Sequence, residues 1–317
     1  MKVVLLAGGV GGAKMAEGLA AIVGRDLTVI VNTGDDLELH GLAVWPDHDT
    51  VAYTLAGLDD EIRGWGVRGE SWTVMDRLEE LGDREWFRLG DKDLATHIWR
   101  TDRLRAGGRP TEIALELAAA MGIEPRILPM ADEPVRTEVR TDDGWLEFQE
   151  YFVHRHQEPT VREVRFRGVA SAQATREVIA AIAHADVIVI APSNPVVSID
   201  PILAVPGIRP ALEEARARGI PGVGVSGIVG GKALKGPADR MLASLGEEVS
   251  ALGIARRFTR LLSHFVLDRV DAGLEPAVRA LGVETLVADT IMSGDESRAR
   301  LADEVLRFAG PSARTKR

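Results

Sequence analysis

The chain of 317 residues has no cysteine, and this absence excludes disulfide bonds, thiolate metal ligands and cysteine nucleophiles. It lacks an apolar run long enough to cross a bilayer, and it begins in a short apolar segment without a signal-peptide pattern. The formal net charge of −10 disfavours nonspecific nucleic-acid binding, which depends on basic side chains. We therefore expect a cytoplasmic protein whose partners include neither a membrane nor a nucleic acid.

Lysine is also scarce, with six residues against 32 arginines. Because arginine is the common surface cation of this chain, a lysine in a glycine-rich loop is a candidate for a specific role. Three lysines stand in such loops: Lys14, Lys232 and Lys235. Chance placement is the alternative interpretation.

What the chain does have is a dense group of glycines after its first apolar run. Residues 2–7 predict a buried strand of a parallel sheet. Four of the next five residues are glycines: Gly8, Gly9, Gly11 and Gly12. Glycines at a strand-to-helix junction are typical of a loop whose amides approach a phosphate, and Lys14 adds a positive charge. A tight structural turn is the alternative.

This loop matches neither common nucleotide motif. Lys14 stands where the dinucleotide fingerprint has its third glycine, and no serine or threonine follows it as in a Walker motif. A second predicted strand, 27–31, ends at Asn32, where a nicotinamide-binding unit carries an acidic residue for the ribose. These differences argue against an NAD-dependent oxidoreductase.

Alternating apolar and amphipathic segments predict an α/β fold with a doubly wound, mostly parallel, Rossmann-like sheet. Further strands are expected at 124–129, 186–191, 220–225, 264–268 and 283–287. Helices are expected at 12–23, 50–121 in several pieces, 173–184, 207–218, 237–245, 273–281 and 295–309.

The middle of the chain interrupts this alternation. We expect residues 1–57 and 170–309 to form the Rossmann-like core, and residues 58–169 to form a helical and small antiparallel insertion with a hairpin turn at 142–144. The tail, 310–317, is expected to be disordered.

Three polar loops should meet at the carboxyl edge of the sheet, where such folds bind ligands. They are residues 8–14, 192–198 and 226–237. The second loop offers the candidate binding residues Ser193, Asn194, Pro195 and Ser198, and the third offers Lys232 and Lys235. Two loops that combine glycine and lysine suggest a diphosphate.

A long polar loop, 32–50, carries several carboxylates beside the glycine loop. Carboxylates near a phosphate require a cation between them, and Mg²⁺ is commonly held by carboxylates and phosphate oxygens. We expect Asp35, Asp36 and Asp49 as metal ligands. Asp36, Asp49 and Lys14 are the candidate catalytic residues, and whether Asp36 or Asp49 holds metal or accepts a proton is open. Helix capping and turn formation are the alternatives for single aspartates.

A third polar segment begins a predicted helix near Asp91. Asp93 and His97 are four residues apart, so they share a helix face and would orient each other. A helix cap and a buried structural histidine are the alternatives. Four tryptophans are concentrated in this region, and they would stack on a flat heterocycle or form helix core: Trp65, Trp72, Trp86 and Trp99.

Six segments in order resemble one family over nearly the whole chain. They are GGVGGAK at 8–14, VNTGDD at 31–36, PDHDT at 46–50, LGDKDLATH at 89–97, LPMADEPV at 128–135 and APSNPVVSI at 191–199. The chain resembles the 2-phospho-L-lactate transferase and phosphoenolpyruvate transferase family of coenzyme F(420) biosynthesis.

The resemblance implies a donor, an acceptor and a cofactor. The donor would be a guanosine diphosphate ester of a three-carbon acid, the acceptor 7,8-didemethyl-8-hydroxy-5-deazariboflavin, the released product GMP, and the cofactor Mg²⁺. By position, Asp49 and Arg88 match the family's deazaflavin contacts, and the nucleotide side is matched by Gly9, Gly11, Gly12, Lys14, Asn32, Ser193, Asn194, Pro195, Lys232 and Lys235. The family also suggests a homodimer.

Two positions depart from the family pattern. His48 replaces an apolar residue in the PDHDT segment, and Gly227 stands where a proline often follows a serine. The first departure leaves the flanking aspartates in place, and the second makes the guanine side less certain. A nucleotide-binding or sugar-nucleotide-binding regulator of the same fold, without turnover, is the alternative function.

Overall fold

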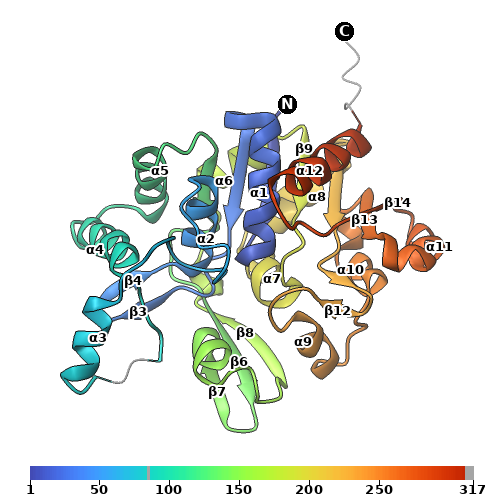
Figure 1. Cartoon of the computed structure of the whole chain (residues 1–317). Coiled ribbons are helices and arrows are strands. Elements are labelled where there is room, and N and C mark those ends of the chain that lie inside the picture. The colour runs from blue at the N-terminus through green and yellow to red at the C-terminus, as the bar shows by residue number, and fades with distance from the viewer. Residues whose placement is uncertain (84–85, 311–317) are drawn as a thin grey trace.

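A computed structural model describes residues 1–83 and 86–310 of the protein (Figure 1). Apart from Gly310, the tail expected to be disordered lies outside the described residues. Within the described part, no single helix is long and apolar enough to span a membrane. One pair of helical segments, Pro195–Ala204 and Ile208–Ala217, reaches the required length and composition only together, and the two are bent by 86°.

The centre of the molecule is a seven-stranded sheet in which every pairing is parallel. Its strands are β1 (Val3–Ala7), β2 (Leu27–Val31), β5 (Arg126–Pro129), β9 (Val187–Ile190), β10 (Gly222–Val225), β13 (His264–Asp268) and β14 (Glu284–Ala288). The spatial order β14-β13-β10-β9-β1-β2-β5 confirms the predicted doubly wound fold. Strand order reverses between β1 and β9, and ligands of this fold class bind at that point.

Both faces of the sheet are buried, which explains why its strands are continuous apolar runs. In β1, Val3 and Leu5 belong to one hydrophobic cluster, whereas Val4 and Leu6 belong to the other. The first cluster includes residues of α1 (Gly9–Val23), α2 (Pro46–Leu55), α5 (Pro110–Ala120) and α12 (Asp295–Ala309). The second includes residues of α6 (Arg176–Ala183), α7 (Asp200–Ala204), α8 (Ile208–Ala217), α9 (Ala238–Ser244), α10 (Ala251–Phe258) and α11 (Glu275–Arg279).

The register of the strands places the loops that follow them at the same edge of the sheet. Leu6 of β1 pairs with Ile30 of β2 and with Ile190 of β9, so Gly8 and Asn32 follow at the same edge. In Figure 1 this edge is the lower end of the sheet, and the N-terminus lies at the opposite end. The meeting of loops 8–14, 192–198 and 226–237 at the carboxyl ends of β1, β9 and β10 agrees with the prediction.

The segment between β2 and β5 differs from the expected long loop. It contains the hairpin β3 (Leu37–Leu39) and β4 (Leu42–Val44), and α2 then begins at Pro46 rather than near residue 50. His40 and Gly41 both have positive φ, as a two-residue hairpin turn requires. The sequence signal was missed because histidine, rather than asparagine or aspartate, precedes the glycine.

In the rest of the middle region, a small antiparallel sheet lies below the edge of the main sheet, whereas α4 (Asp91–Arg105) and α5 lie to one side of the main sheet (Figure 1). Helices α3 (Thr73–Glu80) and α4 are followed by α5 and β5, and β5 is the edge strand of the main sheet. An antiparallel sheet of β6 (Arg136–Thr141), β7 (Gly144–Glu147) and β8 (Glu163–Arg167) confirms the predicted small antiparallel addition. A short hairpin, β11 (Ile228–Val229) and β12 (Lys232–Ala233), precedes α9. Helices α7 and α10 were not predicted.

Candidate active site

The glycine-rich segment lies where β1 meets α1, and three of its glycines, Gly8, Gly11 and Gly12, have close neighbours. A Cβ atom at Gly11 would collide with the carbonyl oxygen of Pro192. A Cβ atom at Gly12 would lie 2.9 Å from both the Cβ of Ala7 and the Oγ of Ser193. Gly12 therefore allows the close helix–strand packing that the third glycine provides in a dinucleotide fold. Side chains at Gly11 and Gly12 would separate the first loop from the loop after β9.

Hydrogen bonds join this segment to α2 and β2. The Gly9 amide donates to Asp47 Oδ1 at 2.7 Å, and Asn32 Nδ2 donates to Asp47 Oδ2 at 2.8 Å. Asn32 Nδ2 also donates to the carbonyl oxygen of Val197 at 3.2 Å. Asp47 lies in the first turn of α2, which begins with a proline at a favourable position. The carboxylate of Asp47 therefore fixes the start of α2 against the start of α1.

Three buried carboxyl groups, Asp35, Asp36 and Asp47, lie in this region. Burial raises the pKa of Asp47 to about 6. Burial also raises the pKa values of Asp35 and Asp36 well above the ordinary range, and the nearby Asp47 contributes to both shifts. Oδ1 of Asp35 and Oδ1 of Asp36 accept no hydrogen bond from any described residue. A cation would offset this accumulation of carboxyl groups.

Asp49 has a different environment, although it is only two residues from Asp47. Both of its carboxylate oxygens accept hydrogen bonds from the guanidinium of Arg100, one of them at 3.0 Å. Burial alone would raise the pKa of Asp49, but Arg100 and the hydrogen bond with His48 outweigh it, and the pKa lies well below its ordinary value. Arg100 also donates to the Ala43 carbonyl at 3.2 Å and lies over the Trp45 ring, 4.3 Å from its centroid.

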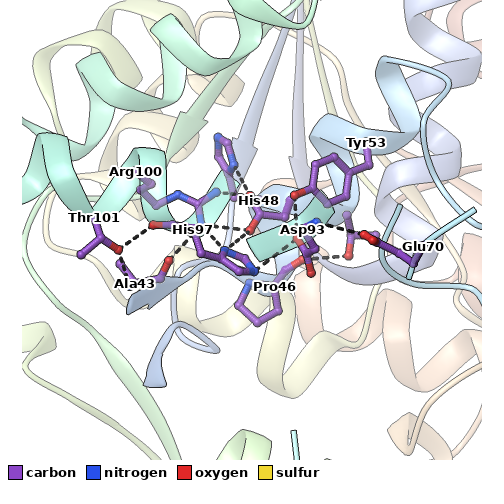
Figure 2. Close-up of polar contacts among 11 residues, drawn as sticks. Ala43, Pro46, His48, Tyr53, Glu70, Asp93, His97, Arg100 and Thr101 are labelled. Carbon is purple, nitrogen blue, oxygen red and sulfur yellow. Dashed lines mark hydrogen bonds and ion pairs between the residues drawn. The ribbon is translucent and has the colours of Figure 1, made fainter. Parts of the chain in front are cut away.

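A second group of polar side chains continues from Arg100 along α4 (Figure 2). His97 Nε2 lies 3.2 Å from Asp93 Oδ1, and the Tyr53 hydroxyl donates to the same oxygen at 2.6 Å. Burial, with the negative charges of Asp49 and Asp93, raises the pKa of Tyr53. The predicted pairing of Asp93 with His97 is present. Ligand atoms of Asp49, Asp93 and His97 lie within 4.8 Å of one another, as in a metal site. The guanidinium of Arg100 already supplies the positive charge there.

A large cavity of about 1290 Å³ opens at the carboxyl edge of the sheet. One end is lined by the glycine-rich segment, Asp35, Asp47 and the loops after β9 and β10, and this end lies at the reversal of strand order. Ligand pockets for a single small molecule commonly measure about 300–1,000 Å³. The cavity therefore has room for two substrates.

The other end of the cavity has an aromatic wall. Its aromatic side chains are Trp65, Trp72, Trp86, Phe87, Phe148 and Phe152. Phe148 and Phe152 stack with ring centroids 5.5 Å apart, and Trp86 stacks on His154 at 5.4 Å. Three of the four tryptophans expected near a flat ring thus line the cavity, whereas Trp99 lies under Arg103 of α4. Such a wall suits a flat heterocycle.

The comparisons with known proteins give one consistent result. The model of the family "2-phospho-L-lactate transferase CofD" matches residues 3–290. The chain is 38% identical to the 2-phospho-L-lactate transferase of Methanosarcina acetivorans over 304 residues, which are 96% of this chain and 97% of the relative. The chain belongs to the CofD family.

Two further relatives carry another name. The chain is 42% identical to the phosphoenolpyruvate transferase of Kitasatospora aureofaciens and 43% identical to that of Streptomyces griseus, each with 98% of both chains covered. A solved structure of a UPF0052-family protein from Bacillus halodurans matches with a TM-score of 0.62 and 17% identity, covering 96% of this chain and 99% of that chain. This likeness concerns the fold alone.

The candidate site residues predicted from the sequence and from the family pattern divide into two groups in the structure. The first group lines the cavity: Gly9, Gly11, Lys14, Asp35, Arg88, Ser193, Asn194, Ser198 and Lys235. Lys14 Nζ donates to the carbonyl oxygen of Met292 at 2.8 Å, and burial lowers the pKa of Lys14. Arg88 pairs with Asp76 at the aromatic end.

The second group does not line the cavity, as far as the described residues show: Gly12, Asn32, Asp36, Asp49, Asp91, Asp93, His97, Pro195 and Lys232. Asp91 accepts hydrogen bonds from Ser71 Oγ at 2.6 Å and from the Thr73 and Val74 amides, so it caps α3. Pro195 begins a helical turn, and Lys232 is exposed on β12.

Several cavity residues were absent from the predicted set. Asp47 is the most informative, because the PDHDT segment drew attention to its neighbour Asp49 instead. Phe148 and Phe152 follow β7, and nothing in their spacing marked them. The segment from Thr290 to Ser293 follows β14, so the rule that ligands bind at the carboxyl ends of strands applied to it as well.

Proposed function

We propose that the protein is a transferase that moves a phosphoenolpyruvyl or 2-phospho-L-lactyl group from a guanosine diphosphate ester to the primary hydroxyl of 7,8-didemethyl-8-hydroxy-5-deazariboflavin. The reaction releases GMP and serves coenzyme F(420) biosynthesis. The observation that carries the proposal is the single cavity that joins a glycine-rich, lysine-bearing end to an aromatic wall. Membership in the CofD family and the names of its relatives support the same reaction.

The two ends of the cavity would take the two substrates. Amides at the start of α1 and the loops after β9 and β10 would bind the diphosphate, because backbone N–H groups at a helix start favour anions. The aromatic wall would hold the deazaflavin ring. The acceptor oxygen would then attack the phosphorus that carries the acid, the bond from this phosphorus to the GMP oxygen would break, and the hydroxyl proton would pass to a carboxylate.

Magnesium fits the carboxyl groups at the phosphate end. Asp35 and Asp47 line the cavity, Oδ1 of Asp35 has no described partner, and carboxylate oxygens are the ligands that Mg²⁺ prefers. Asp36 lies close enough to support them. Asp49 fits less well, since the cationic guanidinium of Arg100 bonds both of its oxygens and already offsets its charge, whereas the partners of Asp47 are neutral amides. When bound, Mg²⁺ would offset the negative charge of the phosphoryl group during transfer.

The test is a reconstitution with purified protein, MgCl₂, the deazaflavin and each of the two donors in turn. We expect GMP release and a product whose mass equals the deazaflavin plus the transferred group. Asp35→Asn should lower the rate strongly, whereas Asp186→Asn, at the opposite end of the sheet, should not. Binding of GDP without GMP release from either donor, and without a change in deazaflavin fluorescence, would favour a nucleotide-binding regulator.

A further inference from the structure

A second, smaller cavity of about 90 Å³ opens from the large one beside α1. The two cavities share part of their walls: Val10, Lys14, Thr50, Gly64, Trp65, Lys235 and Ser293. We call the place where these residues lie the junction. Its α1 residues are Val10 and Lys14, which are four apart, so the junction extends along one face of α1 from its start to its second turn.

Two ammonium groups meet at the junction. The positive charge of Lys235 is one cause that lowers the pKa of Lys14, after burial and the charge of Arg298, so these groups are close. Lys235 Nζ also lies directly against Gly64, where a Cβ atom would collide with it. Within residues 1–83 and 86–310, neither Lys14 nor Lys235 forms an ion pair. The charges of Glu61 and Asp59 oppose the lowering of the Lys14 pKa, but neither carboxylate is paired with either lysine, so an anion bound between the two ammonium groups would be favourable.

The inner end of the small cavity, unlike the junction, is lined by carboxyl groups and by an arginine that is already paired. Arg298 is buried and already paired with Glu17, Glu61 and Asp295. Glu61 and Asp59 also line this end, and their carboxyl groups would repel a second anion. Lys14 Nζ instead donates to the carbonyl oxygen of Met292, which lines the large cavity and not the small one, so its ammonium group lies on the side of the large cavity.

We infer that the junction is the binding site for the carboxylate of the transferred three-carbon acid. This inference rests on the proposed function. In that reaction the donor's diphosphate lies at the start of α1 and the acceptor ring lies at the aromatic wall, which leaves the carboxylate of the acid to be bound. Lys14 and Lys235 would each donate to one carboxylate oxygen, and the limited space beyond the junction would select short acids.

The experiment compares two donors: the natural guanosine diphosphate ester and its analogue with a neutral carboxamide in place of the carboxylate. Affinities are measured by calorimetry without deazaflavin, so that no turnover is required. Wild type should bind the carboxylate donor about 10- to 100-fold more tightly, as expected for loss of a charge-assisted hydrogen bond. Lys235→Met should lose most of this preference and bind GDP alone as wild type does.

Lys2→Met is the matched control, because Lys2 is exposed at the far end of β1, and it should keep the wild-type preference. Equal binding of the two donors by wild type would overturn the inference. So would a Lys235→Met variant that binds GDP and both donors equally less well, since Lys235 would then belong to the diphosphate. A wild-type preference for the carboxylate donor without transfer to deazaflavin would instead refute the proposed function and leave the subsite standing.

Discussion

At the scale of single residues, Arg100 has the largest of the fully buried side chains described. A buried guanidinium is costly unless it is paired, and here it contacts Asp49, the Ala43 carbonyl and the Trp45 ring. All three partners lie at or next to the start of α2. Arg100 therefore holds the helix turn that carries Asp47 toward the glycine-rich segment.

Removing Arg100 would leave the Asp49 carboxylate buried without its guanidinium partner, with His48 as the remaining hydrogen-bond partner. We expect Arg100→Met to lower the free energy of unfolding by about 3–5 kcal/mol in urea titrations. Arg103→Met is the control: Arg103 lies over Trp99 and pairs with Glu116 at the surface, so its loss should cost about 1 kcal/mol or less. The double variant Arg100→Met, Asp49→Leu should recover part of the stability. Equal losses at Arg100 and Arg103 would contradict this account.

The pKa of Asp47 gives stability a definite dependence on pH. Its folded pKa of about 6 lies above the ordinary 3.8, so the folded state binds more protons than the unfolded state between these values. Asp47 therefore stabilises the folded state below about pH 4, and this contribution to the free energy of unfolding is lost as the pH rises through 6. Asp47→Asn removes the effect, and it also relieves the neighbouring Asp35 in the same direction.

The measurement is a set of urea titrations at pH 4, 5, 6 and 7 with EDTA present. Relative to wild type, Asp47→Asn should gain stability as pH rises, by up to about 3 kcal/mol across this range. A difference between variant and wild type that stays constant with pH would show that Asp47 does not titrate there.

Residue roles were harder to predict than residue positions. The PDHDT segment was interpreted as part of a loop, and Asp49 was expected there as a metal ligand or proton acceptor. In a helix, residues two apart point about 200° away from each other around the axis. Asp47 therefore faces the cavity, whereas Asp49 faces α4 and Arg100, 51 positions later in the chain. No local sequence pattern around Asp49 predicts a partner that lies so far along the chain.

At the scale of elements, the aromatic wall is built by pieces that come from different parts of the middle region. Phe148 and Phe152 follow β7, whereas Trp72 and Trp86 flank α3. The predicted alternation of the hairpin located β6 and β7 correctly, but not the helical turn after them. The wall depends on packing between segments that are far apart in the sequence. Hydrophobic periodicity and secondary-structure propensity do not predict such contacts.

Phe152→Ala tests this wall. Phe152 is half-buried, lines the cavity and stacks on Phe148, so its removal should weaken deazaflavin binding about 3- to 10-fold, as expected for one aromatic contact. GDP affinity should be unchanged, because the phosphate end lies elsewhere. Fluorescence titration of the deazaflavin and calorimetry with GDP provide the two readings. Parallel losses of both affinities would mean that the variant damages the fold and not the wall.

At the scale of the whole molecule, the sheet was predictable because its strands are buried on both faces and stand out as apolar runs separated by helices. The position of β5 was less predictable. It comes from the middle segment 58–169 and yet pairs with β2, so part of that segment belongs to the main sheet. Strand pairing is decided by contacts far apart in sequence. The homodimer stays a prediction.

Ligand binding should stabilise the whole molecule, since the cavity wall draws on segments from Gly8 to Ser293. With GDP at 100 times its dissociation constant, we expect the free energy of unfolding to rise by about 2.7 kcal/mol.

Mg²⁺ alone should stabilise the protein more at pH 7.5 than at pH 5, because protons compete for Asp47 at the lower pH. Thermal melts with Mg²⁺, and with K⁺ at matched ionic strength, test this. Equal effects of Mg²⁺ at both pH values would argue against carboxylate ligands.

The hydrogen bond from Lys14 to Met292 joins residues 278 positions apart. The cavity wall therefore joins α1, the first helix of the fold, to the segment that follows β14, the last strand. A chain that stops before Thr290 still contains every strand of the main sheet, but it lacks the segment that Lys14 binds. Termination directly after β14 should thus abolish activity although all seven strands are made, because both this segment and α12 are lost.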